Sequence, residues 1–167
     1  MKPWVGKDFK DQEIRVLILG ESWYGDFQQK DEIRYIETWI RRESPGKTDR
    51  FFSRIYNACN SKSAAQSTEL ERSVFWHKVA FTNLVSESVG NKARIRPNDA
   101  HWKRGVRRLE LLLKKLKCNR VLVLGLEAGF YAETVLKKVE ITFVKCPHPS
   151  GYGVTTECLR EKWRELQ

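Results

Sequence analysis

The stretch Arg15-Val16-Leu17-Ile18-Leu19 is continuously apolar from Val16 onward and is followed at once by Gly20. Short apolar runs that end at a turn residue are typical of the central strands of a parallel sheet. Three further stretches have the same character and lie at residues 79–81, 120–124 and 141–144. The sequence therefore predicts four buried strands that run in parallel.

Helical spacing of apolar residues separates these strands. It is clearest over Asp99–Lys117, which begins at the helix-start signal Pro97-Asn98-Asp99. Further helices are expected at residues 31–40, 50–60, 126–138 and 156–166. Because strands and helices alternate, parallel pairing with right-handed crossovers is expected. We expect an α/β fold, a three-layer α/β/α sandwich with a central four-stranded parallel sheet, in which residues 1–167 form a single domain.

The composition limits the classes of protein to consider. The chain has 167 residues, and its 41% hydrophobic content excludes a disordered chain. No apolar run approaches the ~20 residues that a membrane-spanning helix needs. The first residues, Met1-Lys2-Pro3-Trp4, lack the apolar core of a secretory signal. We therefore expect a cytoplasmic protein with no membrane partner.

The charge is strongly positive, with 31 Lys and Arg against 21 Asp and Glu, or +10 overall. Such an excess favours a polyanionic partner, most often nucleic acid, because binding releases counterions from phosphates. A basic soluble protein without such a partner is the alternative, since net charge alone does not exclude it. The basic residues gather at 41–42, 47–54, 92–96 and 103–108. The last of these clusters is interleaved with core positions, as on a solvated helix face.

The four cysteines stand singly along the chain, at Cys59, Cys118, Cys146 and Cys158. No C-x-x-C pair is present, so the spacing argues against a zinc site or an iron–sulfur cluster. Reduced thiols are expected for a cytoplasmic protein.

Three polar side chains follow predicted strands. Glu21 follows the first strand, Asn83 the second, and His148 the last. In an open α/β sheet, ligands bind in the crevice outside the carboxyl ends of the strands. A carboxylate, an amide and an imidazole that are far apart in the sequence are therefore expected to share one pocket.

The motifs that carry these residues resemble those of the uracil-DNA glycosylase superfamily. They are Gly20-Glu21-Ser22-Trp23-Tyr24-Gly25, Asn83 and His148-Pro149-Ser150, and the resemblance extends in order from residue 15 to residue 152. It is to a divergent branch without the iron–sulfur cysteines. The resemblance implies a monofunctional DNA glycosylase of base excision repair. Such an enzyme would hydrolyse the N-glycosidic bond of uracil or a related modified pyrimidine flipped out of single- or double-stranded DNA, leaving an abasic site. It also implies a monomer with no metal or organic cofactor.

The resemblance assigns catalytic roles to three residues. His148 would donate a hydrogen bond to O2 of the leaving pyrimidine, where negative charge grows. Glu21 matches the acid of the thermophile-type branch, whereas the best-known branch carries its acid one position later, at Ser22 in this chain. Asp26 is therefore an alternative residue for activating water. Without a catalytic role, Glu21 would be a turn residue and His148 an ordinary loop histidine.

The base-binding residues implied by the resemblance are Gly20, Ser22, Tyr24, Asn83 and either Phe51 or Phe52. Tyr24 would exclude the methyl group of thymine by steric overlap, unless it is simply a packed aromatic. The Asn83 amide would read the Watson–Crick edge of the base, unless it only closes a strand end. One of the two phenylalanines would stack on the flipped base, and the sequence leaves open which one.

DNA contacts are expected at two segments. Ser150 and the backbone of Gly151 would hold a flanking phosphate, and Tyr152 would enter the space that the flipped base leaves in the duplex. Arg94 and Arg96, which follow the Asn83 strand, are expected to contact DNA as well.

Three other functions remain open at this point. One is a glycosylase for a hypermodified phage base that serves in defence. Another is a catalytically silent DNA-binding relative, because Ser22 replaces the acid of the best-known branch. The third is a nucleotide-binding protein that uses the same crevice, since this architecture supports many functions.

Overall fold

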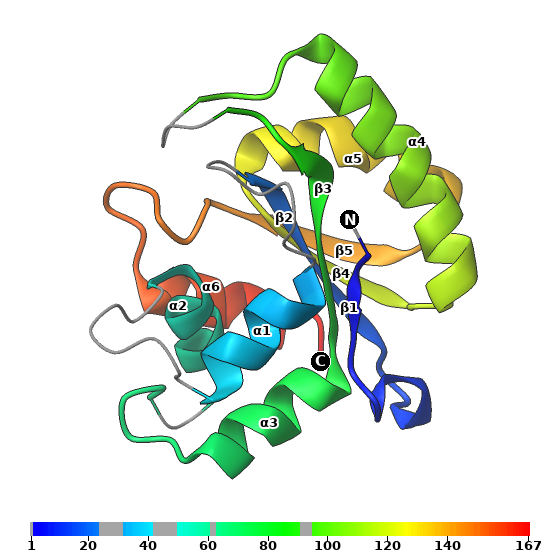
Figure 1. The fold of residues 1–167 in the computed structure, drawn as a ribbon. Coiled ribbons are helices and arrows are strands. Elements are labelled where there is room, and N and C mark those ends of the chain that lie inside the picture. The colour runs from blue at the N-terminus through cyan, green and yellow to red at the C-terminus, as the bar shows by residue number, and fades with distance from the viewer. Residues whose placement is uncertain (1, 24–31, 42–49, 61–62, 91–94) are drawn as a thin grey trace.

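The computed structural model describes residues 2–23, 32–41, 50–60, 63–90 and 95–167. Its centre is a five-stranded sheet with the order β1-β3-β2-β4-β5 (Figure 1). The strands are β1 (Trp4–Val5), β2 (Val16–Trp23), β3 (Ala80–Ser88), β4 (Arg120–Leu124) and β5 (Thr142–Cys146). The four predicted strands are all present and pair in parallel.

The expectation of a purely parallel, four-stranded sheet was wrong, because β1 adds an antiparallel strand at the edge beside β3. Trp4 of β1 is buried, and its indole N–H donates a 2.8 Å hydrogen bond to the carbonyl oxygen of Trp76. A strand of two residues is too short to produce a periodic pattern, which is why the sequence did not indicate it.

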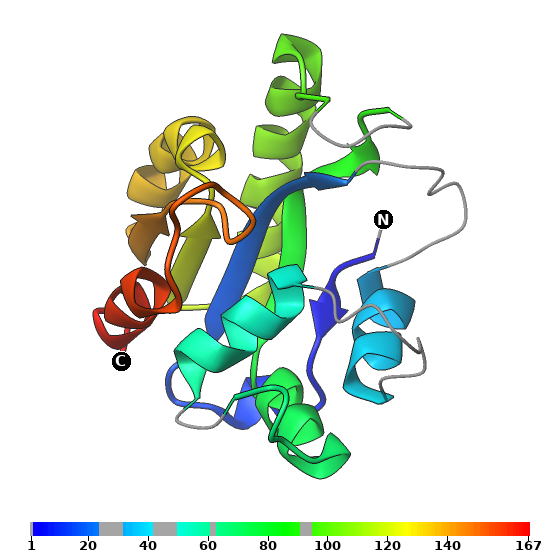
Figure 2. The same cartoon turned by 90° about the vertical axis from the view of Figure 1, so that its left-hand side faces the viewer.

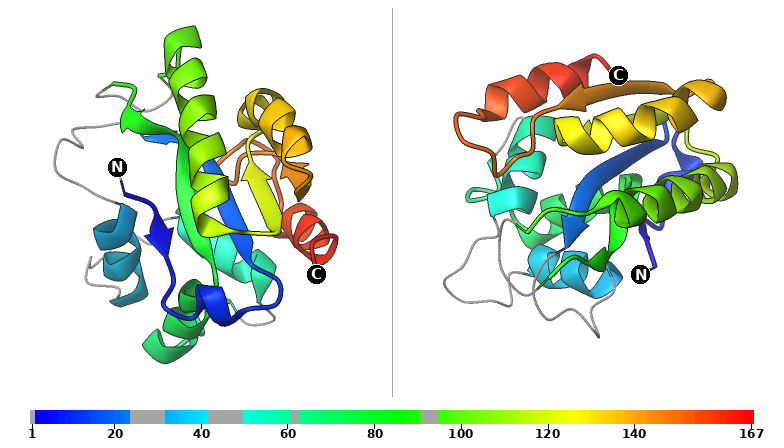
Figure 3. Two further views of the ribbon diagram at one scale, coloured as in Figure 1. Left: turned by 90° about the vertical axis from the view of Figure 1, so that its right-hand side faces the viewer. Right: turned by 90° about the horizontal axis from the view of Figure 1, so that it is seen from above.

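In the part of the chain that the structure describes, six α-helices cover the two faces of the sheet. They are α1 (Glu32–Arg41), α2 (Arg50–Cys59), α3 (Glu69–Lys78), α4 (Asp99–Leu116), α5 (Leu126–Lys138) and α6 (Thr156–Arg164). Residues of α1, α2, α3 and α6 join one apolar core, and residues of α4 and α5 join the other. In Figure 2, α2 lies in front of the central strands and α4 behind them. When the right-hand side of Figure 1 faces the viewer, α4 lies in front of the central strands (Figure 3, left). The result is compatible with a three-layer α/β/α arrangement.

The helix α3 was not anticipated from the sequence. It begins with a capping box, in which the Thr68 side chain accepts from the Glu71 backbone N–H and the Glu71 side chain accepts from that of Thr68. Its buried side chains are Arg72, Phe75 and Trp76. The Arg72 guanidinium donates to the carbonyl oxygens of Ile40 and Ser67, and a buried arginine interrupts the apolar pattern that would mark the helix.

Strands β2 and β3 continue past the residues expected to end them. Gly20 is paired with Asn83, Ser22 with Val85 and Trp23 with Ser88, so the polar residues belong to the strand ladder. Strand β4, by contrast, ends at Leu124, because Gly125 adopts a positive φ of 122° and turns the chain into α5. Glu21 and Asn83 therefore do not lie in turns, although they do lie at the carboxyl edge defined by β4 and β5.

Within the described ranges, none of the helices combines the length and the apolar composition that crossing a membrane would require.

Candidate functional site

The candidate site lies at the carboxyl edge of the sheet, where the register brings three motifs to one level. Leu19 of β2 is opposite Val123 of β4, and the last residue of β4 is opposite Cys146, the last residue of β5. Gly20 and its partner Asn83 are therefore level with the ends of β4 and β5. His148 comes two residues after the end of β5.

Asn83 and Phe51 both approach Gly20. A Cβ atom at position 20 would lie 2.0 Å from Oδ1 of Asn83 and 3.6 Å from Cζ of Phe51. Asn83 is 4% exposed, whereas the Phe51 ring is half-buried. Glycine at position 20 leaves room for the amide of Asn83, which a side chain there would displace.

His148 lies beside Phe51, with ring centroids 5.2 Å apart and planes inclined by 31°. The backbone N–H of Ser150 donates to its Nδ1 at 3.2 Å, and the Gly151 N–H donates to its carbonyl oxygen at 2.7 Å. Arg54 of α2 secures the same loop by donating to the carbonyl oxygen of Pro149. These bonds fix both the loop and the orientation of the ring.

The protonation state of His148 follows from these contacts. Burial, followed by the positive charge of Arg96, holds the pKa of the imidazole below its usual value of 6.5. Because Nδ1 accepts a hydrogen bond, the proton of the neutral ring is on Nε2. The side chain is therefore a neutral hydrogen-bond donor at neutral pH.

Glu21 is 8% exposed and forms an ion pair with Arg96, with 3.1 Å between Oε1 and the guanidinium nitrogen. The same guanidinium contacts the carboxylate of Glu127, in the first turn of α5. Burial raises the pKa of Glu21, Arg96 opposes this rise, and Glu127 adds to it. The carboxylate also lies close to Gly125, where a Cβ atom would come within 3.1 Å of Oε2.

Asn83 and Glu21 reach this edge from opposite faces of the sheet. Gly20 and Asn83 face α2, which supplies Phe51. Side chains alternate along a strand, so Glu21 faces the side of α5, which supplies Glu127. The site thus combines an amide, an aromatic ring and an imidazole (Asn83, Phe51 and His148) with an ionic cluster on the other side of the same strand end.

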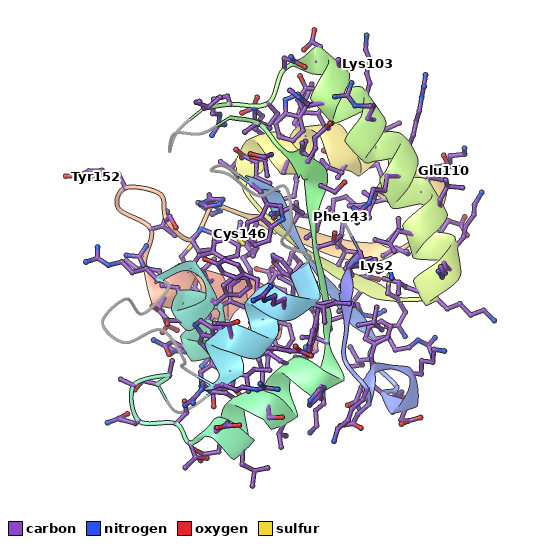
Figure 4. All side chains as sticks on the ribbon, in the orientation of Figure 1. Lys2, Lys103, Glu110, Phe143, Cys146 and Tyr152 are labelled. Atoms are coloured by element: carbon purple, nitrogen blue, oxygen red, sulfur yellow. The ribbon has the colours of Figure 1, made fainter. Side chains whose placement is uncertain are left out.

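Other predicted site residues have simpler positions. Phe52 is 1% exposed and packs in the core, so Phe51 is the phenylalanine at the site. Ser22 is half-buried within β2. Ser150 is exposed, and Gly151 partly so, in the loop after β5. Tyr152 is fully exposed and projects from the body of the molecule (Figure 4). Tyr24, Asp26 and Arg94 lie outside the described residues.

Two residues near the site were missed by sequence reasoning. Glu127 follows Gly125 at the exit of β4, and the rule that pointed to the other strand exits could have found it. Arg108 of α4 donates to the carbonyl oxygen of Asn83 at 3.2 Å and to Oγ1 of Thr82 at 3.0 Å. It supports β3 behind the Asn83 side chain.

No set of three or more His, Cys, Asp or Glu side chains in the described part of the chain is arranged to hold a metal ion. The four cysteines are free thiols. In comparisons with known proteins, the sequence matches no family model and no curated protein.

Proposed function

We propose that the protein is a DNA glycosylase that hydrolyses the N-glycosidic bond of uracil, or of a related modified pyrimidine, flipped out of DNA. The observation that carries the proposal is the state of His148. It is held as a neutral imidazole with its donor proton on Nε2, next to the aromatic ring of Phe51 and at the same strand edge as Asn83. A neutral donor in a partly buried site is suited to a leaving group that gains negative charge.

The base would lie among Asn83, Phe51 and His148. The carboxamide of Asn83 offers both an acceptor and donors, which complement the N3–H and O4 of uracil. The half-buried Phe51 ring supplies an apolar surface for stacking, worth roughly 1–3 kcal/mol per base in other proteins. Together these groups favour a flat heterocycle with one polar edge.

The sugar would lie towards Glu21. As the bond between C1′ and the base breaks, its electron pair leaves with the base, and positive charge grows on the sugar. A carboxylate near C1′ stabilises that charge and can take the proton from water as the water oxygen bonds to C1′. His148 meanwhile stabilises the charge on the pyrimidine O2. Asp26, which lies outside the described residues, remains an alternative for the water-activating role.

The net charge of +10 supports a DNA substrate. Arg96 lies beside the carboxylate, and Ser150 and Tyr152 are exposed in the loop that follows His148. Phosphate contacts from such residues would position the strand without reading its sequence.

Release of bases from oligonucleotides tests the proposal directly. Single- and double-stranded substrates would carry uracil, hydroxymethyluracil, hypoxanthine, thymine mispairs or a phage-type modified cytosine, and alkaline cleavage would report abasic sites. We expect release of a pyrimidine by the wild-type protein and its loss in His148→Ala. His77→Ala is the matched control, because His77 stacks on Trp4 at the amino end of β3.

Different outcomes separate the alternatives. Release of only the modified cytosine would favour the defence enzyme over a uracil glycosylase. Tight binding of DNA with no base release from any substrate would overturn the proposal and favour a catalytically silent relative. Activity that survives in Glu21→Gln would move the water-activating role to another acid, such as Asp26.

A further inference from the structure

The acid proposed for catalysis is engaged by a cation, and this creates a problem for its role. Glu21 is paired with Arg96, and a carboxylate neutralised by a guanidinium gives little stabilisation to a second positive charge on the sugar. A second carboxylate contacts the same guanidinium. Glu127 contacts the other terminal nitrogen of Arg96, from the first turn of α5.

We propose that Glu127 is a positioning residue for the glycosylase reaction. It divides the charge of Arg96 between two carboxylates, so that the cluster of Glu21, Arg96 and Glu127 keeps a net negative charge beside the sugar. This inference rests on the proposed function. Glu127 does not touch the substrate in this role, because it acts through Arg96.

The charges around Glu21 are consistent with this arrangement. Among the described residues, Arg96 and Glu127 are the charged groups that act on the pKa of the Glu21 carboxyl, in opposite directions. Arg96 is also close enough to His148 to lower the pKa of its imidazole. One arginine therefore influences both the acid and the donor of the proposed site. Its charge must be balanced for the acid to act.

The position of Arg96 agrees with a shared ion pair. Its side chain is 59% exposed, and the ion pairs hold it over the nearly buried Glu21. Without Glu127, Glu21 would be the only carboxylate of this cluster paired with the guanidinium. Without Arg96, two carboxylates would face each other with no cation between them. The two removals thus change the acid in opposite ways.

The test compares Glu127→Gln, Glu127→Asp and Arg96→Gln with the wild-type protein. Glu133→Gln is the matched control, because Glu133 is on the same helix and pairs with Lys137 and Lys145 instead. We expect Glu127→Gln to lower kcat roughly tenfold with little change in KM, since the position of the charge and not substrate binding is altered. Glu127→Asp should restore part of the rate.

The pH dependence separates this role from a structural one. The acidic limb of the kcat profile should move to lower pH in Glu127→Gln and to higher pH in Arg96→Gln. A carboxyl-carbon NMR titration of Glu21 should show the same two directions, and it needs no catalytic activity. If Glu127→Gln matches Glu133→Gln in rate and in titration, the inference is overturned. If the wild-type protein releases no base, the proposed function fails, and the titration alone decides whether Glu127 controls the charge of Glu21.

Discussion

The side-chain oxygen of Asn83 occupies the space beside Gly20 on the neighbouring strand, 2.0 Å from where a Cβ atom at position 20 would lie. The two residues are direct partners in the β2–β3 ladder. The amide of Asn83 therefore packs against the backbone of Gly20, and the energetic coupling of the two positions can be measured.

We expect Gly20→Ala to displace the Asn83 side chain, because the backbone of a paired strand cannot withdraw. Overpacking of this kind costs about 1–3 kcal/mol of unfolding free energy. Urea denaturation would measure this loss, and the base-release assay would show a large fall in kcat/KM.

The double variant Gly20→Ala/Asn83→Ala is the control for this prediction. Removing the amide should return most of the lost stability without restoring activity, because the clash is relieved but the base-reading group is gone. Strictly additive effects on stability would contradict the contact between these two positions.

The neighbouring phenylalanines should respond differently to truncation. Phe52 is buried among Tyr35, Trp39 and Trp76, so Phe52→Ala should cost about 3–5 kcal/mol of unfolding free energy. Phe51→Ala should lower the free energy of unfolding less than Phe52→Ala does, because the Phe51 ring is only half-buried. It should lower kcat/KM more, because that ring is at the site. Thermal unfolding and kcat/KM would be measured together, with Phe51→Tyr retaining a ring. Full activity in a folded Phe51→Ala variant would remove Phe51 from the site.

The His148 ring gives a prediction about pH. Its pKa in the folded state is below 6.5, through burial and the charge of Arg96. At a pH above the pKa of His148 in the unfolded chain, the imidazole is neutral in both the folded and the unfolded state. As the pH falls below that value, the unfolded chain takes up a proton that the folded protein resists, so stability decreases until the folded pKa is reached. His148→Gln should make the urea midpoint fall less between about pH 7.5 and about pH 5.5.

His77 also has a lowered pKa, so the wild-type protein carries a second contribution of the same sign. The difference between the wild-type and His148→Gln curves isolates His148. Nitrogen-15 shifts of the imidazole provide an independent reading, since the Ser150 contact requires the proton on Nε2. A proton found on Nδ1 would contradict the assigned role of the ring.

The sequence predicted the layers of this fold better than the ends of its strands. Apolar patterns located the four parallel strands, and Asn98 caps α4 next to the expected start, since these signals are local. The continuation of β2 and β3 past Gly20 and Asn83 was not predicted. Those segments are held by pairing with each other. The paired residues Gly20 and Asn83 are 63 positions apart in the chain, and pairing over such a separation leaves no local sequence pattern.

The same distinction applies to the candidate site. Glu21, Asn83 and His148 were expected to share one pocket because strand ends meet at one edge of a parallel sheet. The register brings them to one edge, but Glu21 faces α5 whereas Asn83 faces α2. The contact of Arg96 with Glu127 was not foreseen, because it depends on how a segment before α4 packs against the first turn of α5. The choice between Phe51 and Phe52 was not foreseen either, because the two are adjacent apolar residues of α2 and the sequence does not show which one packs into the core.

Tyr152 provides the last prediction, on DNA binding. The ring is fully exposed between Gly151 and Gly153, so Tyr152→Ala should leave the urea midpoint unchanged. If the ring enters the space left by the flipped base, the variant should bind a uracil-containing duplex more weakly, while binding to the single strand changes less, because a single strand has no stack to refill. Fluorescence anisotropy would compare the two substrates. Leu70→Ala is the control, since Leu70 is also exposed but lies on α3 at the other end of the sheet. Equal duplex affinity in the two variants would exclude Tyr152 from this role.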